Sequence, residues 1–103
     1  MIAIIDYGMG NLLSVQKALA SLGAEAAVVR TPEEVEQAEA LILPGVGAFG
    51  RAMENLTQRG LAPAIKAAVG EGKPFLGICL GMQLTIVTCM PRQIPSKGIW
   101  LTL

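Results

Sequence analysis

Short apolar runs alternate with amphipathic stretches along most of this chain. The apolar runs are Ile2–Ile5, Ala26–Val29, Ala40–Leu43 and Phe75–Ile78, and continuous runs of this length are typical of strands buried on both faces. Between the first two runs, Leu12, Val15, Leu19 and Leu22 recur at three- and four-residue steps, which places them on one helix face. The alternation predicts an α/β fold with a parallel sheet covered by helices.

Boundary signals define the expected helices. Asn11 is a good N-cap and Gly23 is suited to follow the end of the first helix. The run Thr31-Pro32-Glu33-Glu34 has the form of a capping box with proline at the first helical position, and it predicts a helix from Pro32 to about Glu39. Helical spacing returns in two later stretches, at Met53 and Leu56 and then at Leu61, Ile65, Ala68 and Val69.

Two segments do not fit the regular pattern. Pro44 is expected to stop the third strand, and the segment Pro44–Gly50 holds three glycines in seven positions, which predicts an irregular loop. After Gln83 the chain changes character, and we expect no fifth strand-helix unit in the remaining residues. We therefore divide the chain into a domain at residues 1–84 and an atypical tail at residues 85–103.

The composition indicates that this chain has more apolar surface than it can bury by itself. The chain has 103 residues, of which 52% are hydrophobic and only 16% are charged, and its mean hydropathy is +0.54. That is more apolar surface than a domain of this size easily buries, so a partner or a missing half is expected. The net charge is zero and aromatic residues make up 4%, which argues against nucleic-acid binding.

The sequence gives no sign of export or of membrane insertion. Met1–Asp6 lacks the features of a signal peptide, and the apolar run Phe75–Met90 is shorter than the roughly 20 residues that cross a bilayer. Two cysteines are too few for a disulfide scaffold. We expect a cytoplasmic protein that does not associate with membranes.

The chain contains no histidine. A Ser/His/Asp or Cys/His catalytic group therefore cannot be completed within these residues, and a metal site built on imidazole is excluded. We predict no metal ligands.

Cys79 is the residue most suited to chemistry. It follows a predicted buried strand and has glycine two positions away on each side, at Gly77 and Gly81, which is the pattern of a nucleophile elbow. Such a turn places the sulfur at a helix N-terminus, where backbone N–H groups favour the thiolate. The alternative is a small apolar cysteine in the core.

The glycine-rich loop is the second candidate element. Glycine backbone can present N–H groups to a developing oxyanion without steric obstruction. In a doubly wound sheet, this loop and the Cys79 elbow both emerge at the carboxyl ends of their strands, where ligands bind.

Three motifs occur in order: D-Y-G-M-G-N at Asp6–Asn11, P-G-V-G-A-F-G at Pro44–Gly50, and G-I-C-L-G-M-Q at Gly77–Gln83. Over residues 1–84 the chain resembles the glutaminase subunits of imidazole glycerol phosphate synthase, which are class I glutamine amidotransferases. The resemblance implies a flavodoxin-like three-layer parallel sheet, here incomplete.

The resemblance also implies site residues. Cys79 would attack the carboxamide of glutamine, with the Leu80 N–H and the backbone at Gly45, Val46 and Gly47 forming the oxyanion hole. Gln83 would bind the substrate. The ammonia would pass to a (βα)8-barrel cyclase subunit, and no cofactor is implied. Asn11 would face that partner, although it serves equally well as a plain N-cap.

The chain departs from the family in its second part. The family completes a Cys-His-Glu triad from residues beyond the elbow, whereas this chain has no histidine. Our hypothesis is that residues after Leu84 are an aberrant terminus of a truncated subunit. We predict negligible glutamine turnover by this chain alone.

Two other functions compete with this interpretation. Gly8 and Gly10 follow the first strand as in a dinucleotide-binding turn, but Leu13 occupies the place of the third glycine. The closer alternative is a non-catalytic flavodoxin-like binding or thiol redox-sensing module that uses the elbow cysteine.

Overall fold

The computed structural model describes residues 1–8, 10–45, 47–79 and 98–101, apart from the side chains of Cys79 and of residues 98–101. In chain order, the elements are β1 (Ile2–Ile5), α1 (Leu12–Ser21), β2 (Ala26–Val29), α2 (Pro32–Gln37), β3 (Ala40–Gly45), α3 (Phe49–Gln58), α4 (Leu61–Gly70), β4 (Phe75–Cys79) and β5 (Gly98–Leu101). Strands and helices alternate as the apolar pattern predicts.

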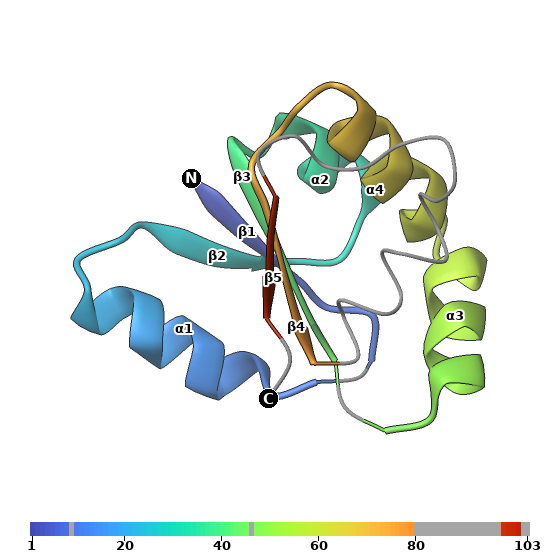
Figure 1. Ribbon diagram of the computed structural model, residues 1–103, viewed down its shortest axis with the longest axis horizontal. Coiled ribbons are helices and arrows are strands. Elements are labelled where there is room, and N and C mark those ends of the chain that lie inside the picture. Colours follow the sequence, from blue (N-terminus) through green and yellow to red (C-terminus); the bar gives the residue numbers. More distant parts are fainter. Residues whose placement is uncertain (9, 46, 80–97, 102–103) are drawn as a thin grey trace.

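The strands form one parallel sheet in the order β2-β1-β3-β4-β5. This is the order of flavodoxin-like doubly wound folds. Helix α1 lies on one face, against β1 and β2, whereas α2, α3 and α4 lie on the other (Figure 1). The three-layer architecture expected from the sequence is confirmed.

The core lies between the sheet and helices α2, α3 and α4. Successive strand residues point to opposite faces, so Ile5, Leu41, Leu43 and Phe75 face these helices and are at most 3% exposed. The side chains that meet them from the helices include Val35, Leu56, Leu61, Ile65 and Val69. Burying each of these contributes about 1.5–3 kcal/mol.

Local signals set the helix boundaries. Asn11 caps α1 through its Oδ1, which accepts the Ser14 N–H at 3.3 Å. Thr31 and Glu34 form the predicted capping box at the start of α2. Gly23 has φ +77° directly after the α1 C-cap and donates its N–H to the Ala20 carbonyl oxygen at 3.0 Å. These predictions are confirmed.

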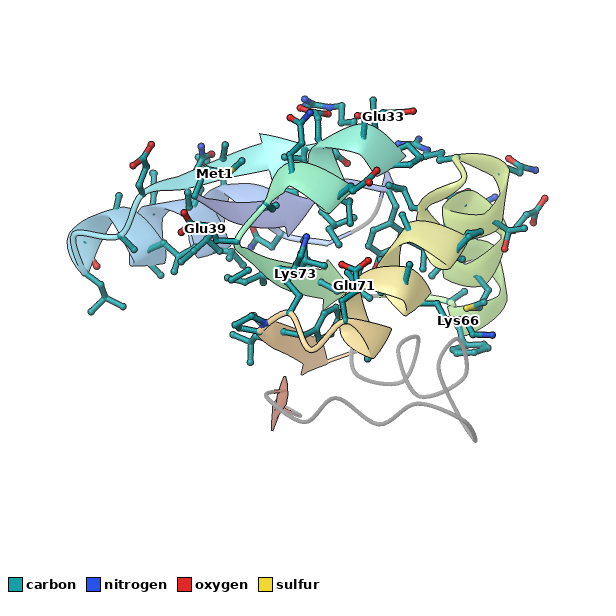
Figure 2. The ribbon with its side chains drawn as sticks, turned by 90° about the horizontal axis from the view of Figure 1, so that it is seen from above. Met1, Glu33, Glu39, Lys66, Glu71 and Lys73 are labelled. Carbon is teal, nitrogen blue, oxygen red and sulfur yellow. The ribbon has the colours of Figure 1, made fainter. Side chains whose placement is uncertain are left out.

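Helix α2 ends two residues before the predicted boundary. Ala38 is extended rather than helical, and it is only 4% exposed within the core. Lys73, labelled in Figure 2, donates from Nζ to the carbonyl oxygens of Val35 and Glu36, at 3.1 and 2.8 Å. The lysine thus caps the last carbonyl groups of α2, an interaction between distant segments that no local pattern reveals.

The glycine-rich segment is more regular than predicted. Strand β3 continues through Pro44 to Gly45, and α3 begins at Phe49, so among the described residues only Gly47 and Ala48 lie between the two elements. Pro44 is tolerated in this central strand because the pairing of β1 with β3 ends at Ile4 and Ile42, so no ladder bond to β1 is lost. Our expectation that Pro44 stops the strand was wrong.

A fifth strand lies in the tail, for which the sequence predicted no fifth strand-helix unit. Residues Gly98–Leu101 pair in parallel with β4, with Phe75 opposite Gly98 and Ile78 opposite Leu101. The sequence did not predict this strand, because its apolar run is short and closely follows two prolines.

Candidate active site

The candidate site lies at the carboxyl ends of β1, β3 and β4, which are adjacent in the sheet. The connection after β1 leads to α1 on one face, and the connection after β3 leads to α3 on the other (Figure 1). The boundary between β1 and β3 is therefore the topological switch point, where ligands bind in doubly wound sheets.

Cys79 and the glycine-rich segment meet at this edge. Cys79 is the last residue of β4, one residue further than the strand predicted from the sequence. Its register partner on β3 is Gly45, and neighbouring strands are about 4.8 Å apart. Two candidate residues that are 34 positions apart in the chain are thus side by side.

The rest of the predicted oxyanion hole is only partly described. Gly45 is buried, and Gly47 is exposed with φ +102°, a conformation that favours glycine. Val46, Leu80 and Gln83 lie outside the described residues. The roles predicted for these five residues, and for Cys79 as the nucleophile, remain predictions.

Asn11 has a settled local role. It is exposed and its side chain caps α1, which confirms the N-cap interpretation. Its position in the turn after β1 places it at the same edge as the candidate site. The prediction that it faces a partner subunit stays a prediction.

Tyr7 lies beside the candidate site, and the sequence predicted no role for it. Its side chain is completely buried, and its hydroxyl donates to the Pro44 carbonyl oxygen at 2.7 Å. Burial raises the pKa of the phenol to about 12, so it remains a protonated donor at physiological pH. The signal available in the sequence was a lone tyrosine at the end of an apolar run, because a buried tyrosine usually has a hydrogen-bond partner.

Gly10 is the second contact between the turn after β1 and the glycine-rich segment. Its φ is +102°, and a Cβ atom built on it would lie 3.3 Å from the carbonyl carbon and oxygen of Pro44. A side chain at this position would force the two backbones apart by a few tenths of an ångström. The glycine is therefore needed for both its conformation and the space it leaves.

Charged groups surround the start of the turn. Asp6 Oδ1 accepts the Gly8 N–H at 3.0 Å, and Asp6 Oδ2 is 2.9 Å from Nε of Arg30. Next to Gly8 is a polar hollow of about 520 Å³ lined also by Arg51, Glu54 and Asn55 of α3. The Asp6 side chain thus stabilises the turn through its hydrogen bond with the Gly8 N–H, and α3 contributes polar side chains next to the turn.

Two features are absent from the described part of the chain. Among those residues, no three His, Cys, Asp or Glu side chains gather closely enough to hold a metal ion. No helix among them has the length and apolar character that crossing a membrane requires.

Several curated proteins with one name are similar to this chain. The chain is 50% identical over 99 residues to "Imidazole glycerol phosphate synthase subunit HisH" of Nostoc punctiforme, which covers 96% of this chain and 47% of that protein. It is 61% identical over 84 residues to the protein of the same name from Bacillus licheniformis, covering 82% and 40%. The chain thus spans less than half the length of these curated relatives.

Solved structures show the same fold. The structure of PurLQS from Thermotoga maritima matches with a TM-score of 0.71 at 23% identity, over 86% of this chain and 43% of that chain. A structure described as a glutamine amidotransferase matches with a TM-score of 0.68 at 28% identity, over 97% and 55%. The alternative of a redox-sensing module finds no support among these relatives.

A family model fits most of the chain and includes all three sequence motifs. The model described as "Glutamine amidotransferase class-I" matches residues 3–94, a range that contains most of β1, all of β2 to β4, and residues beyond 84. With the parallel sheet and the register of Gly45 beside Cys79, this match shows that the chain belongs to the class I glutamine amidotransferase family.

Proposed function

We propose that this chain is part of the glutaminase subunit of an imidazole glycerol phosphate synthase, which releases ammonia from glutamine for a cyclase subunit in histidine biosynthesis. The observation that carries the proposal is the placement of Cys79 at the carboxyl end of β4, beside Gly45. The curated relatives from Nostoc punctiforme and Bacillus licheniformis, which bear the name of that synthase subunit, support the choice of pathway.

The proposed reaction uses Cys79 as the nucleophile. The thiolate Sγ adds to the carboxamide carbon of glutamine, and the C–N bond then breaks as the nitrogen takes up a proton and leaves as ammonia. Water hydrolyses the γ-glutamyl thioester to glutamate and restores the thiol. Backbone N–H groups at Gly45, Val46, Gly47 and Leu80 would stabilise the oxyanion, and Gln83 would bind the substrate.

These 103 residues contain no histidine, so in this proposal the proton carrier lies outside them. The family resemblance implies a Cys-His-Glu triad, so a His and a Glu from another segment complete the proposed site. Acid-base assistance contributes about 10²–10⁴-fold to such reactions. We therefore expect negligible glutamine turnover by this chain alone.

The proposed partner is a (βα)8-barrel cyclase subunit that receives the ammonia, with Asn11 facing it, in the cytoplasm. The turn that carries Asn11 adjoins the Pro44–Gly45 backbone through Gly10. A partner that docks on this turn would thus lie next to the proposed oxyanion loop.

The test is covalent labelling by a chloroketone analogue of glutamine. Sγ of Cys79 displaces chloride to form a thioether, a step that needs no histidine. We expect peptide mass mapping to find the label on Cys79 and not on Cys89, and we expect excess glutamine to slow the labelling. A Cys79→Ser variant is the matched control. Labelling of both cysteines at rates that glutamine does not change would contradict the proposal.

A further inference from the structure

A long-range hydrogen bond joins the turn after β1 to Pro44, next to the proposed oxyanion loop. Tyr7 lies two residues after β1 and its ring is part of the core on the α2–α4 side of the sheet. From there its hydroxyl donates to the Pro44 carbonyl oxygen at 2.7 Å, across 37 residues of sequence. The bond is buried, so water does not compete for either group.

This hydrogen bond takes the place of a missing sheet bond. Pro44 has no N–H, and the ladder between β1 and β3 ends two residues earlier, at Ile4 and Ile42. Without Tyr7, the Pro44 carbonyl would lose this donor in a buried position, and an unsatisfied buried carbonyl is unfavourable. The phenol thus supplies the donor that the sheet does not provide on this side.

The bond also fixes the direction of the next amide group. A peptide unit is planar and trans, so the Gly45 N–H points opposite to the Pro44 C=O. The carbonyl is turned toward Tyr7, which follows β1, and β3 lies between β1 and β4. The Gly45 N–H is therefore turned toward β4, the strand that carries Cys79.

A second contact restrains the same peptide unit. The backbone of Gly10 packs against Pro44 so closely that a Cβ atom would lie 3.3 Å from its carbonyl carbon and oxygen and 3.5 Å from the Gly45 nitrogen. Tyr7 and Gly10 thus act on one peptide unit from the same turn. That unit carries the Gly45 N–H and directly precedes residues 46 and 47, and all three residues are proposed oxyanion donors.

We propose that Tyr7 is a positioning residue for the glutaminase reaction, because its hydroxyl orients the Pro44–Gly45 peptide from which the oxyanion loop begins beside Cys79. The inference rests on the proposed function. It adds a role for a side chain that does not touch the substrate but sets the direction of the Gly45 N–H, at the start of the proposed oxyanion loop.

The variant Tyr7→Phe tests this role, since it removes only the hydroxyl. Cys89→Ser is included throughout, so that Cys79 is the single thiol. Labelling by the glutamine chloroketone is resolved into the inhibitor's half-saturating concentration and its maximal rate. We expect the maximal rate to fall about tenfold, because a misplaced oxyanion donor affects the reacting state most, and the half-saturating concentration to change less than about twofold.

Two controls separate positioning from folding. Chloroacetamide carries the same leaving group without the glutamyl part, and its rate with Cys79 should be the same in both proteins within about twofold. Ile65→Val in α4 removes one buried methylene and is expected to leave the maximal chloroketone rate unchanged. If Ile65→Val slows the chloroketone as much as Tyr7→Phe does, the effect is general destabilisation and the proposal is overturned.

A direct structural measurement completes the test. In nuclear magnetic resonance spectra, Tyr7→Phe should shift the Pro44 carbonyl carbon and the Gly45 amide and speed hydrogen exchange at residue 45, whereas Ile65→Val should leave them in place. Unchanged signals in Tyr7→Phe would overturn the positioning role, whatever the labelling shows.

If wild type is not labelled but these signals move, the proposed function fails and the structural part of this inference stands. Equal labelling of wild type and Tyr7→Phe overturns the positioning role and leaves the proposed function intact.

Discussion

The two ends of the sheet are built differently. At the carboxyl end, the turn after β1 packs backbone against backbone on Pro44 and is held by the buried Tyr7 hydroxyl. At the amino end, the turn at Gly23 has no atom within 4 Å of a Cβ position. Figure 2 shows Met1 and Glu39 at that end as an exposed ion pair. Of these two turns, the closely packed one lies at the edge that carries the candidate site. The proposed oxyanion hole at that edge requires amide groups with fixed directions.

The largest expected effect compares Gly10→Ala with Gly23→Ala. Both glycines have positive φ, at +102° and +77°, so alanine costs about 1 kcal/mol of strain at either position. At Gly10 the methyl group also meets the Pro44 carbonyl at 3.3 Å, so we expect a total loss of about 2–3 kcal/mol. Urea unfolding of both variants measures the difference.

Equal losses for the two alanine variants would break the comparison between the ends. That result would mean that the turn after β1 can move away from Pro44 at little cost. The maximal chloroketone labelling rate then gives a second reading, since only Gly10→Ala is expected to slow the reaction of Cys79.

The next effect is the alkaline titration of Tyr7. It is the only tyrosine in the chain, so the absorbance of its phenolate reports on this residue alone. Burial raises its pKa to about 12 in the folded protein, whereas the unfolded value is about 10. We expect the native midpoint to lie well above the midpoint in urea.

The same shift predicts a stability change with a definite sign. Above about pH 10 the unfolded tyrosine loses its proton while the folded one keeps it, so the stabilisation is complete below that pH and is lost as the pH rises toward about 12. The full amount is about 2–3 kcal/mol. Tyr7→Phe should lack this alkaline component relative to wild type. If the native protein titrates at the same pH as the unfolded protein, the ring is not buried. That result would also contradict the hydrogen bond to Pro44.

The smallest effects compare the ion pairs at the two ends. Asp6 is 15% exposed and also accepts the Gly8 N–H, whereas its partner Arg30 is 64% exposed. Asp6→Asn keeps an acceptor for Gly8 and should cost about 1 kcal/mol, less at high salt. Glu39 is 86% exposed, and Glu39→Gln should change stability by no more than about 0.5 kcal/mol. Thermal unfolding at low and high salt measures both, and a larger loss for Glu39→Gln would reverse the ranking of the two ends.

The sequence predicted most of the fold, because its signals are local. Four apolar runs became β1 to β4, and the capping residues Asn11 and Thr31 begin helices as expected. The errors lie where distant segments interact. Pro44 continues a strand because β1 no longer pairs with it, and α2 ends at Gln37 with Lys73 capping its carbonyl groups.

The sequence also predicted part of the candidate site, because some of its signals are local. The glycines around Cys79 and in the Pro44–Gly50 segment mark two unusual backbone regions, and parallel sheets bring such regions to one edge. That Gly45 and Cys79 are register partners depends on the strand order, which no local pattern specifies. The hydrogen bond of Tyr7 was not predicted, because its acceptor is 37 residues away in the chain.

By itself, the sequence determined the alternation of strands and helices, the helix caps and the cysteine between two glycines. These features follow from side-chain periodicity and backbone preferences within a few residues. Only the tertiary structure decided which turns touch, which carbonyl receives the tyrosine hydroxyl and how close the two backbones come at Gly10. The reason is physical, since these contacts arise when the strands take their places in the sheet and bring distant backbone groups within hydrogen-bonding distance.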